Sequence, residues 1–396
     1  MPHVPASLNP FVWNRPLGPE GVVGMQPFAE RCARILKART NVALFGPRGT
    51  GKTTFAGVLG AELARDHGPG AGPFVTVYVD LQHAFSLAAF ASAVHAALVA
   101  HPDARLRRAA QARLRQIERE LEVDLRVVKF RERRRDAARE DGAAQVLAEV
   151  LRVPVRVGRD IAIVLDEFQA LRHCKGQPLA ILRGALLGPD AGAVSLLLTG
   201  SLRGAIELML RSSREPLFAQ AAELELPAIG YDEFADHLDL AFTATGRPID
   251  PDALDRLLAV TRLHPKRTQQ LAWQAWELVP EGTTVTPDVV EDALDGLLAG
   301  PYVEFAAEVG TLAAGGEADE NDRRALYLLA AEGRPTSTPA VLARYGFSTH
   351  STLGAAVDRL VARGLLVRAP RGAPAFSDPL LAEWLVRTSP FRERPG

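Results

Sequence analysis

The chain has 396 residues, of which 47% are hydrophobic and 23% are charged, and its formal net charge at pH 7 is −1. This length is sufficient for two or three domains with buried cores, and the near-zero charge excludes attraction of nucleic acid by an overall positive field. Two cysteines are too few for a disulfide framework or a cysteine zinc site. The N-terminal MPHVPASLNPFVW has no signal-peptide pattern, and no apolar run approaches about 18 residues, so we expect a cytoplasmic protein without membrane contact.

Five short β-rich segments alternate with helical stretches in the first 228 residues. Several of them are nearly continuous apolar runs, which is typical of strands covered on both faces. The alternation predicts an α/β fold with a five-stranded parallel sheet. The five segments are Asn41–Phe45, Phe74–Asp80, Ile161–Asp166, Val194–Thr199 and Glu223–Leu226.

A long helical insertion, about residues 85–150, is expected between the second and third strands. Its middle, residues 102–140, contains thirteen basic and eight acidic residues and ends in KFRERRRDAARE. Our first interpretation is a pair of solvated helices with many surface ion pairs, and the alternative is an arm that binds nucleic acid or a partner.

Four helices are expected between residues 231 and 298, because Asp250-Pro251 and Thr286-Pro287 each place a capping side chain before a first-turn proline. A linker rich in glycine and acids, GTLAAGGEADEND, follows at residues 310–322. The last 75 residues contain eleven arginines, no lysine and six acids. Their expected order of three helices and a hairpin, LVRAPRGAPAFSDP, is similar to that of a winged helix.

The segment GPRGTGKTT follows the first predicted strand and opens a helix. It has the spacing of a P-loop, whose backbone N–H groups surround the phosphates of a nucleotide. Lys52 is expected to reach the β- and γ-phosphates, and the Thr53 hydroxyl to bind Mg²⁺. The residues predicted to bind ATP are Gly46, Pro47, Arg48, Gly49, Thr50, Gly51, Lys52, Thr53 and Thr54.

Two acids end the third predicted strand, in IAIVLDEFQAL. Ligands of α/β sheets bind at the carboxyl ends of strands, so Asp166 is predicted to hold Mg²⁺ and Glu167 to act as general base toward the attacking water. At the end of the fourth strand, SLLLTGS, Thr199 or Ser201 is a candidate sensor of the γ-phosphate.

Together the P-loop, DEFQ, LTGS and PLF…LELPAI resemble the archaeal-type ATPases of the AAA+/STAND group, in this case a bacterial member. The segment NPFVWNRPLGPEGVVGM is similar to the N-terminal linker of that family, and HPKRTQQLAWQAW to its helical lid. The resemblance implies that Arg267, and also Lys266, points at the γ-phosphate from the lid. We expect His264 to pack beside Pro265 rather than to bind a metal.

One departure from the family concerns the position of a subunit-bridging arginine, which is occupied by Gln220 in PLFAQAA. Arg203, Arg211 and Arg214 are nearby alternatives. We therefore expect slow ATP hydrolysis by the chain alone.

The winged-helix pattern implies that the third helix enters the major groove and that the wing contacts the DNA backbone. The candidate phosphate contacts are Arg359, Arg363, Arg368 and Arg371, with residues 348–352 nearest the bases. The alternative is a winged helix that docks a protein partner or inhibits the ATPase.

The expected domains are an ATPase core with the N-terminal linker and helical insertion (1–228), a helical lid (229–300), a linker (301–321) and a winged-helix domain (322–396). The predicted function is an ATP-dependent molecular switch that uses ATP and Mg²⁺ and binds double-stranded DNA. A STAND-like signalling or defence regulator is the alternative, and an initiator that oligomerises around DNA is a third, weaker hypothesis.

Overall fold

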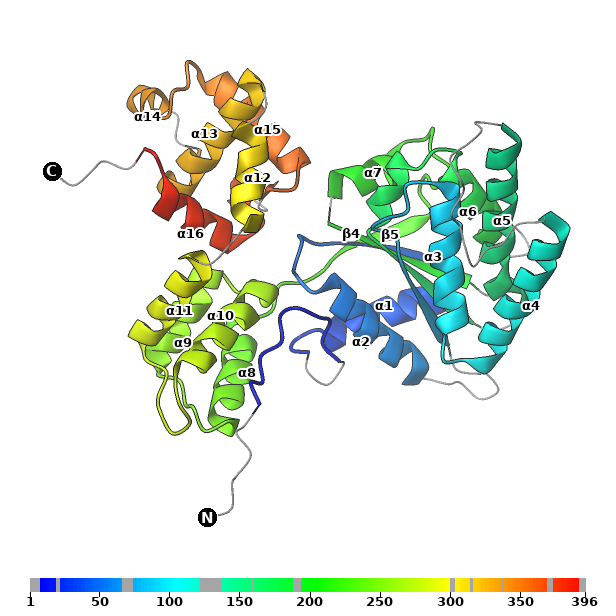
Figure 1. The fold of residues 1–396 in the computed structure, drawn as a ribbon, viewed down its shortest axis with the longest axis horizontal. Helices are drawn as coiled ribbons and strands as arrows, with labels where there is room; N and C mark the ends of the chain where they lie inside the picture. Colours follow the sequence, from blue (N-terminus) through cyan, green and yellow to red (C-terminus); the bar gives the residue numbers. More distant parts are fainter. Residues whose placement is uncertain are drawn as a thin grey trace, which may run out of the picture. The chain divides into compact units, whose positions relative to one another are not determined.

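The structure is a computed structural model of the chain, and it describes residues 8–18, 22–65, 74–121, 137–157, 160–187, 194–201, 203–299, 303–313, 316–335, 338–368 and 373–391. The chain forms two compact units (Figure 1). The sheet unit comprises residues 18–46 and 52–227. The helical unit comprises residues 1–17, 47–51 and 228–396. None of the described helices is both long and apolar enough to cross a membrane.

In the described part of the sheet unit, five parallel strands form one sheet. Their order is β2-β3-β4-β1-β5, so β4 separates the strand before the P-loop from the strand that ends in Asp166. The strands are β1 (Asn41–Phe45), β2 (Val75–Asp80), β3 (Ile161–Asp166), β4 (Val194–Gly200) and β5 (Ala221–Glu225). The predicted parallel five-stranded sheet is therefore confirmed.

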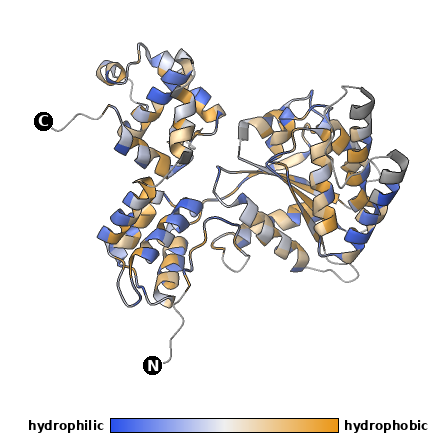
Figure 2. Ribbon diagram, in the orientation of Figure 1, coloured by the Kyte–Doolittle hydropathy of each residue, from blue (hydrophilic) through white to orange (hydrophobic). Residues whose placement is uncertain are grey.

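Alternate residues of the central strands enter two separate hydrophobic cores. Val42, Leu44 and Val164 pack on α1 (Gln26–Lys37) and α2 (Lys52–Arg65) on one face. The opposite face packs on the helices of the insertion and on two shorter ones, and Figure 2 shows the hydrophobic colour of the strands between these layers. These helices are α3 (Leu87–Ala100), α4 (Ala104–Leu121), α5 (Ala137–Arg156), α6 (Pro178–Leu186) and α7 (Arg203–Arg211).

A buried asparagine joins three strands at the start of β1. The side chain of Asn41 donates to the Gln220 carbonyl at 2.9 Å and accepts from the Leu196 N–H at 2.8 Å. Because its backbone also pairs with β5, Asn41 fixes the register of β1 between its two neighbours.

The four helices expected after residue 230 are present in the helical unit. They are α8 (Tyr231–Ala244), α9 (Pro251–Thr261), α10 (Pro265–Leu278) and α11 (Pro287–Ala299). As predicted, Asp250 caps α9, accepting the Asp252 N–H at 3.1 Å.

The N-terminal segment was expected to belong to the ATPase core, but its described part packs on this helical group. Phe11 is buried with its ring centroid 4.5 Å from that of Phe242, and the side chain of Asn9 donates to the Trp273 carbonyl at 3.1 Å. The packing of Phe11 on Phe242 of α8 and the hydrogen bond from Asn9 to α10 account for this difference.

A C-terminal helical group follows, with a two-stranded antiparallel hairpin. It contains α12 (Val303–Ala313), α13 (Glu317–Glu332), α14 (Pro339–Arg344), α15 (His350–Ala362), β6 (Leu366–Arg368), β7 (Pro374–Phe376) and α16 (Pro379–Thr388). The expected linker 301–321 differs from the structure, because α12 and the first turns of α13 occupy most of it. Acidic residues near a helix N-terminus are favoured by the helix dipole, which explains why an acid-rich sequence begins α13.

Replacing Asn41 with Ala should lower the free energy of unfolding by about 1–3 kcal/mol, because it leaves the buried N–H of Leu196 without an acceptor. Chemical denaturation of the full chain measures the change. Thr76→Val is the matched control in β2: the Thr76 hydroxyl is buried without a partner, so its loss should be neutral or stabilising. Equal losses in both variants would contradict the strand-joining role of Asn41.

Candidate nucleotide-binding site

The loop after β1 holds its backbone in the conformation that an anion-binding loop needs. Gly49 and Gly51 have φ of 79° and 95°, a region that side chains disfavour. Successive N–H groups in such a turn form a concave anion site. Lys52, which is buried, donates from Nζ to the Gly46 carbonyl at 2.8 Å, and Thr50 Oγ1 donates to the Pro47 carbonyl at 2.8 Å.

Asp166 is the centre of a polar cluster at the carboxyl end of β3. Its Oδ2 accepts from Thr53 Oγ1 at 2.9 Å, and its Oδ1 accepts from Thr199 Oγ1 and from the Glu167 N–H. Asp166 and Thr199 are both buried. The structure thus brings together three of the predicted site residues, Thr53, Asp166 and Thr199, from three separate segments.

Tyr78 also belongs to this cluster, and the sequence analysis missed it. Its hydroxyl donates to Asp166 Oδ2 from the neighbouring strand β2, where Asp80 pairs with Asp166 in register. Burial and the hydrogen bond to Asp166 raise the pKa of the Tyr78 hydroxyl, which therefore stays a donor. Only the pairing of β2 with β3, which the sequence does not specify, could have identified this residue.

Glu167 occupies a left-handed backbone conformation with φ of 52° and ψ of 40°. Such a conformation is strained for a residue with a side chain and is frequent at functional sites. Its Oε2 accepts from Gln169 Nε2 and, at 3.2 Å, from Ser201 Oγ. A Cβ at Gly200 would strike Gln169 and come within 2.6 Å of Ile206 Cδ1, so glycine at position 200 makes room for Gln169.

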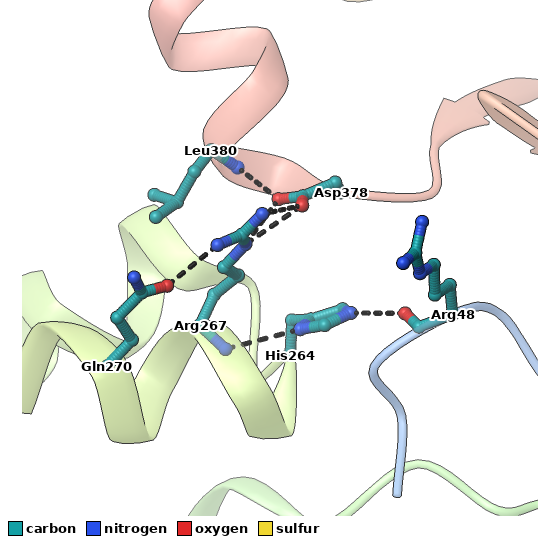
Figure 3. A network of polar contacts seen from close by, with 6 residues as sticks. All are labelled: Arg48, His264, Arg267, Gln270, Asp378 and Leu380. Atoms are coloured by element: carbon teal, nitrogen blue, oxygen red, sulfur yellow. Dashed lines mark hydrogen bonds and ion pairs between the residues drawn. The ribbon is translucent and has the colours of Figure 1, made fainter. Parts of the chain in front are cut away.

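Arg267 is buried in the helical unit, with only 3% of its surface exposed. Figure 3 shows its polar contacts. Its guanidinium is engaged by Asp378 through Nε–Oδ2 and Nε–Oδ1 distances of 2.8 and 3.0 Å and through an Nη2–Oδ2 bond. It also donates to Gln270 at 2.7 Å and lies over the ring of Phe305. The γ-phosphate contact implied by the family resemblance stays a prediction, since this guanidinium binds a carboxylate of the C-terminal group.

His264 is the N-cap of α10 rather than only a packing partner of Pro265. Its Nδ1 accepts from the Arg267 N–H at 3.3 Å, and its Nε2 lies 3.0 Å from the Arg48 carbonyl (Figure 3). The Lys266 N–H donates to the Gly49 carbonyl at 3.3 Å. The start of α10 therefore contacts the backbone of the glycine-rich loop, while a phosphate contact from the Lys266 side chain remains a prediction.

The arginines predicted to contact DNA are paired with acids of the same domain. Arg359 binds the buried Asp322 at 2.7 Å, and Arg363 pairs with Asp319. Arg368 pairs with Asp358 on the solvent side of α15. Arg371 lies outside the described residues.

Gln220 and Arg211 both have intramolecular partners near β5. The Gln220 side chain lies 3.4 Å from the Phe218 carbonyl, and Arg211 binds Glu223 and Glu207.

Comparisons with known proteins agree with this organisation. Residues 35–208 match the AAA domain family, and residues 319–374 match the MarR family. The chain carries an AAA domain followed by a MarR-type winged helix. The predicted P-loop ATPase fold with a C-terminal winged helix is thereby confirmed, while membership of the STAND subgroup remains a prediction.

Two archaeal structures share this fold over nearly the whole chain. A Walker-type ATPase of Pyrococcus abyssi has a TM-score of 0.61 and 16% identity, over 94% of this chain and 98% of that protein. The ORC2 protein of Aeropyrum pernix, in ADPNP-ADP complexes, has a TM-score of 0.60 and 16% identity, over 94% of this chain and 95% of that protein. Identities this low establish the fold alone. No curated protein matches the sequence.

Asp378→Asn should lower the free energy of unfolding of the helical unit by about 1–3 kcal/mol, because it leaves the buried Arg267 without its carboxylate while asparagine still caps α16. Denaturant unfolding of the full chain provides the measurement. The matched control, Asp295→Asn, removes an exposed pair with Arg387 and should change stability by less than about 0.5 kcal/mol. A control as destabilising as the test variant would contradict the importance of the Arg267 pair.

Proposed function

We propose that the chain is an ATP-binding and ATP-hydrolysing molecular switch whose winged helix binds duplex DNA. The proposal of ATP hydrolysis is supported mainly by one observation: the hydroxyls of Thr53 and Thr199 both donate to Asp166, and Glu167 is the next residue. A hydroxyl, a carboxylate and an adjacent second carboxylate at the carboxyl end of a parallel strand fit phosphoryl transfer.

The loop at residues 46–54 and Lys52 would bind the triphosphate. In the described structure the Lys52 ammonium contacts the Gly46 carbonyl, and it would exchange this neutral acceptor for the more strongly attractive phosphate oxygens. Thr50, Gly51 and the other residues of the loop would contribute N–H groups.

Thr53 and Asp166 would hold Mg²⁺. The donor set fits this ion, because Mg²⁺ prefers hard oxygen ligands and is usually bound by one or two carboxylates, substrate phosphates and several waters. When bound, Mg²⁺ supplies positive charge next to the phosphoryl oxygens. Tyr78, Thr199 and the Glu167 N–H would orient the Asp166 carboxylate toward it.

Glu167 would accept a proton from the attacking water. Its carboxylate now accepts from Gln169 and Ser201, which orient it at the carboxyl edge of the sheet. Thr199 would report the state of the γ-phosphate through the Asp166 carboxylate that it contacts.

Duplex binding by the winged helix is supported by its basic composition and its MarR-type match. Arg363 and Arg368 have partly exposed ion pairs, and such pairs contribute little stability, so phosphates can replace their carboxylates. Arg359 is held more firmly, because its partner Asp322 is buried. In the sheet unit, Arg113, Arg152 and Arg156 all pair with one carboxylate, Glu149.

The alternative is a STAND-like regulator whose winged helix docks a protein partner or inhibits the ATPase. One observation favours it: Asp378 of the winged helix holds Arg267, the residue that the family resemblance assigns to the γ-phosphate. In that case release of the winged helix by a partner would free the arginine for ATP.

Lys52→Ala should weaken ATP binding by at least about 100-fold, because the phosphates lose their buried cation. Glu167→Gln should retain ATP binding and lose about 10²–10⁴ in turnover, since the amide keeps the shape of the side chain but cannot accept the proton. Equilibrium binding of a fluorescent ATP analogue and phosphate release measure the two effects. Full turnover by Glu167→Gln would exclude the role of general base.

DNA affinity of the full chain should decrease steeply with salt, because each phosphate contact releases about one counterion. Charge reversal at Arg363, Arg368 and Arg371 should weaken binding to all duplex sequences, and it leaves the pair of Arg359 with the buried Asp322 intact. Fluorescence anisotropy with labelled duplexes between about 50 and 200 mM salt gives the slope. Charge reversal at Arg211, whose partners are in the sheet unit, is the control. If the full chain binds no duplex at the lowest salt, the protein-docking alternative is favoured.

A further inference from the structure

A phosphate-binding loop works only when its N–H groups point inward, and its carbonyl groups must then point outward. The peptide unit is planar and, with no cis bond among the described residues, trans, so the carbonyl of one residue and the N–H of the next point in opposite directions. A donor that binds the carbonyl from outside therefore also orients the N–H toward the inside.

Three successive carbonyls of the loop have hydrogen-bond partners, one inside the loop and two at the start of α10. The Pro47 carbonyl accepts from Thr50 Oγ1 at 2.8 Å, and the Gly49 carbonyl accepts from the Lys266 N–H at 3.3 Å. Between them, the Arg48 carbonyl lies 3.0 Å from His264 Nε2. His264 is thus the one side chain from outside the loop among these donors in the described structure.

The chain before α10 places the imidazole at this position. Arg262 and Leu263 both have positive φ, 49° and 58°, and His264 then returns to an extended conformation ahead of Pro265. Two consecutive residues with side chains in the left-handed region are strained, and such strain is typical of functional segments. The ring lies against Gly49, where a Cβ would approach His264 Cε1 to 2.6 Å.

The two hydrogen bonds of the ring define its tautomer. Because Nδ1 accepts the Arg267 N–H, the proton of the neutral ring lies on Nε2, which donates to the Arg48 carbonyl (Figure 3). We propose that His264 is a positioning residue for nucleotide binding, which holds the Arg48–Gly49 peptide with its N–H directed toward the phosphates. This inference rests on the proposed nucleotide binding by the loop.

The charges around the ring make this donor sensitive to acid. Burial lowers the pKa of His264 below its usual 6.5, the nearby Arg267 lowers it further, and Asp378 and the bond to the Arg48 carbonyl oppose the change. The ring is therefore neutral at pH 7 to 8. Protonation, which occurs only as the pH falls through this lowered pKa, places a proton on Nδ1, which removes the acceptor of the Arg267 N–H and displaces the ring.

His264→Asn separates the two functions of the ring. The Asn oxygen still caps α10, whereas the shorter side chain does not reach the Arg48 carbonyl. ATP and ADP affinity of the full chain should fall about 3- to 10-fold, which corresponds to one hydrogen bond. His264→Gln, whose amide reaches farther, should recover at least half of this loss.

The pH profile distinguishes a positioning role from a structural one. The ratio of affinities of wild type and His264→Asn should be constant from pH 7 to 8 and approach one only as the pH falls through the pKa of His264, which lies below 6.5. Titration of the nucleotide cancels in this ratio. Asp250→Ala, which removes the cap of α9 without touching the loop, should lower stability and leave the affinity of the folded protein unchanged.

Equilibrium titration with a fluorescent ATP analogue is the measurement, and Lys52→Ala is its reference. Suppose that wild type binds the analogue and Lys52→Ala does not. If folded His264→Asn then binds it like wild type at pH 7.5, the positioning role of His264 is overturned, while the proposed function stands. If wild type itself binds no nucleotide, the proposed function fails and this inference fails with it.

Discussion

The backbone of one loop imposes the main constraint on this molecule: residues 46–51 must expose N–H groups to an anion while their carbonyls are satisfied elsewhere. Lys52, Thr50, His264 and the Lys266 N–H each bind one carbonyl of the segment 46–49. An unpaired carbonyl in a partly buried loop is costly, so these four donors stabilise the same conformation that binding would use. The glycines with positive φ allow this conformation, and the donors select it.

A second group of contacts arranges the acids of the sheet. Three hydroxyls and one backbone N–H converge on Asp166, and two side chains orient Glu167. Several hydrogen-bond donors fix the direction of a carboxylate. The first acid is thus prepared for a cation and the second for a proton, which is the division of roles that the proposed hydrolysis requires.

Local patterns in the sequence predicted the parts of the fold that depend on local physics. The five strands, the P-loop, the acids after β3 and the helix starts at Asp250 and Thr286 follow from apolar runs, glycine spacing and capping residues. The strand order does not, because it depends on which faces pack together. For the same reason Tyr78 was missed: it reaches Asp166 only through the register of β2 and β3. Likewise, Arg267 and Asp378 are separated by 111 positions along the chain, and no local signal pairs them.

In the proposed switch, nucleotide turnover is coupled to DNA binding in one chain. The most direct test is ATP turnover by the full-length protein, measured with and without duplex DNA at about 50 mM salt, where phosphate contacts are strong. Duplex DNA should stimulate turnover, and charge reversal at Arg363 and Arg368 should remove the stimulation. Equal turnover with and without DNA would contradict this coupling and would favour a winged helix that docks a protein partner.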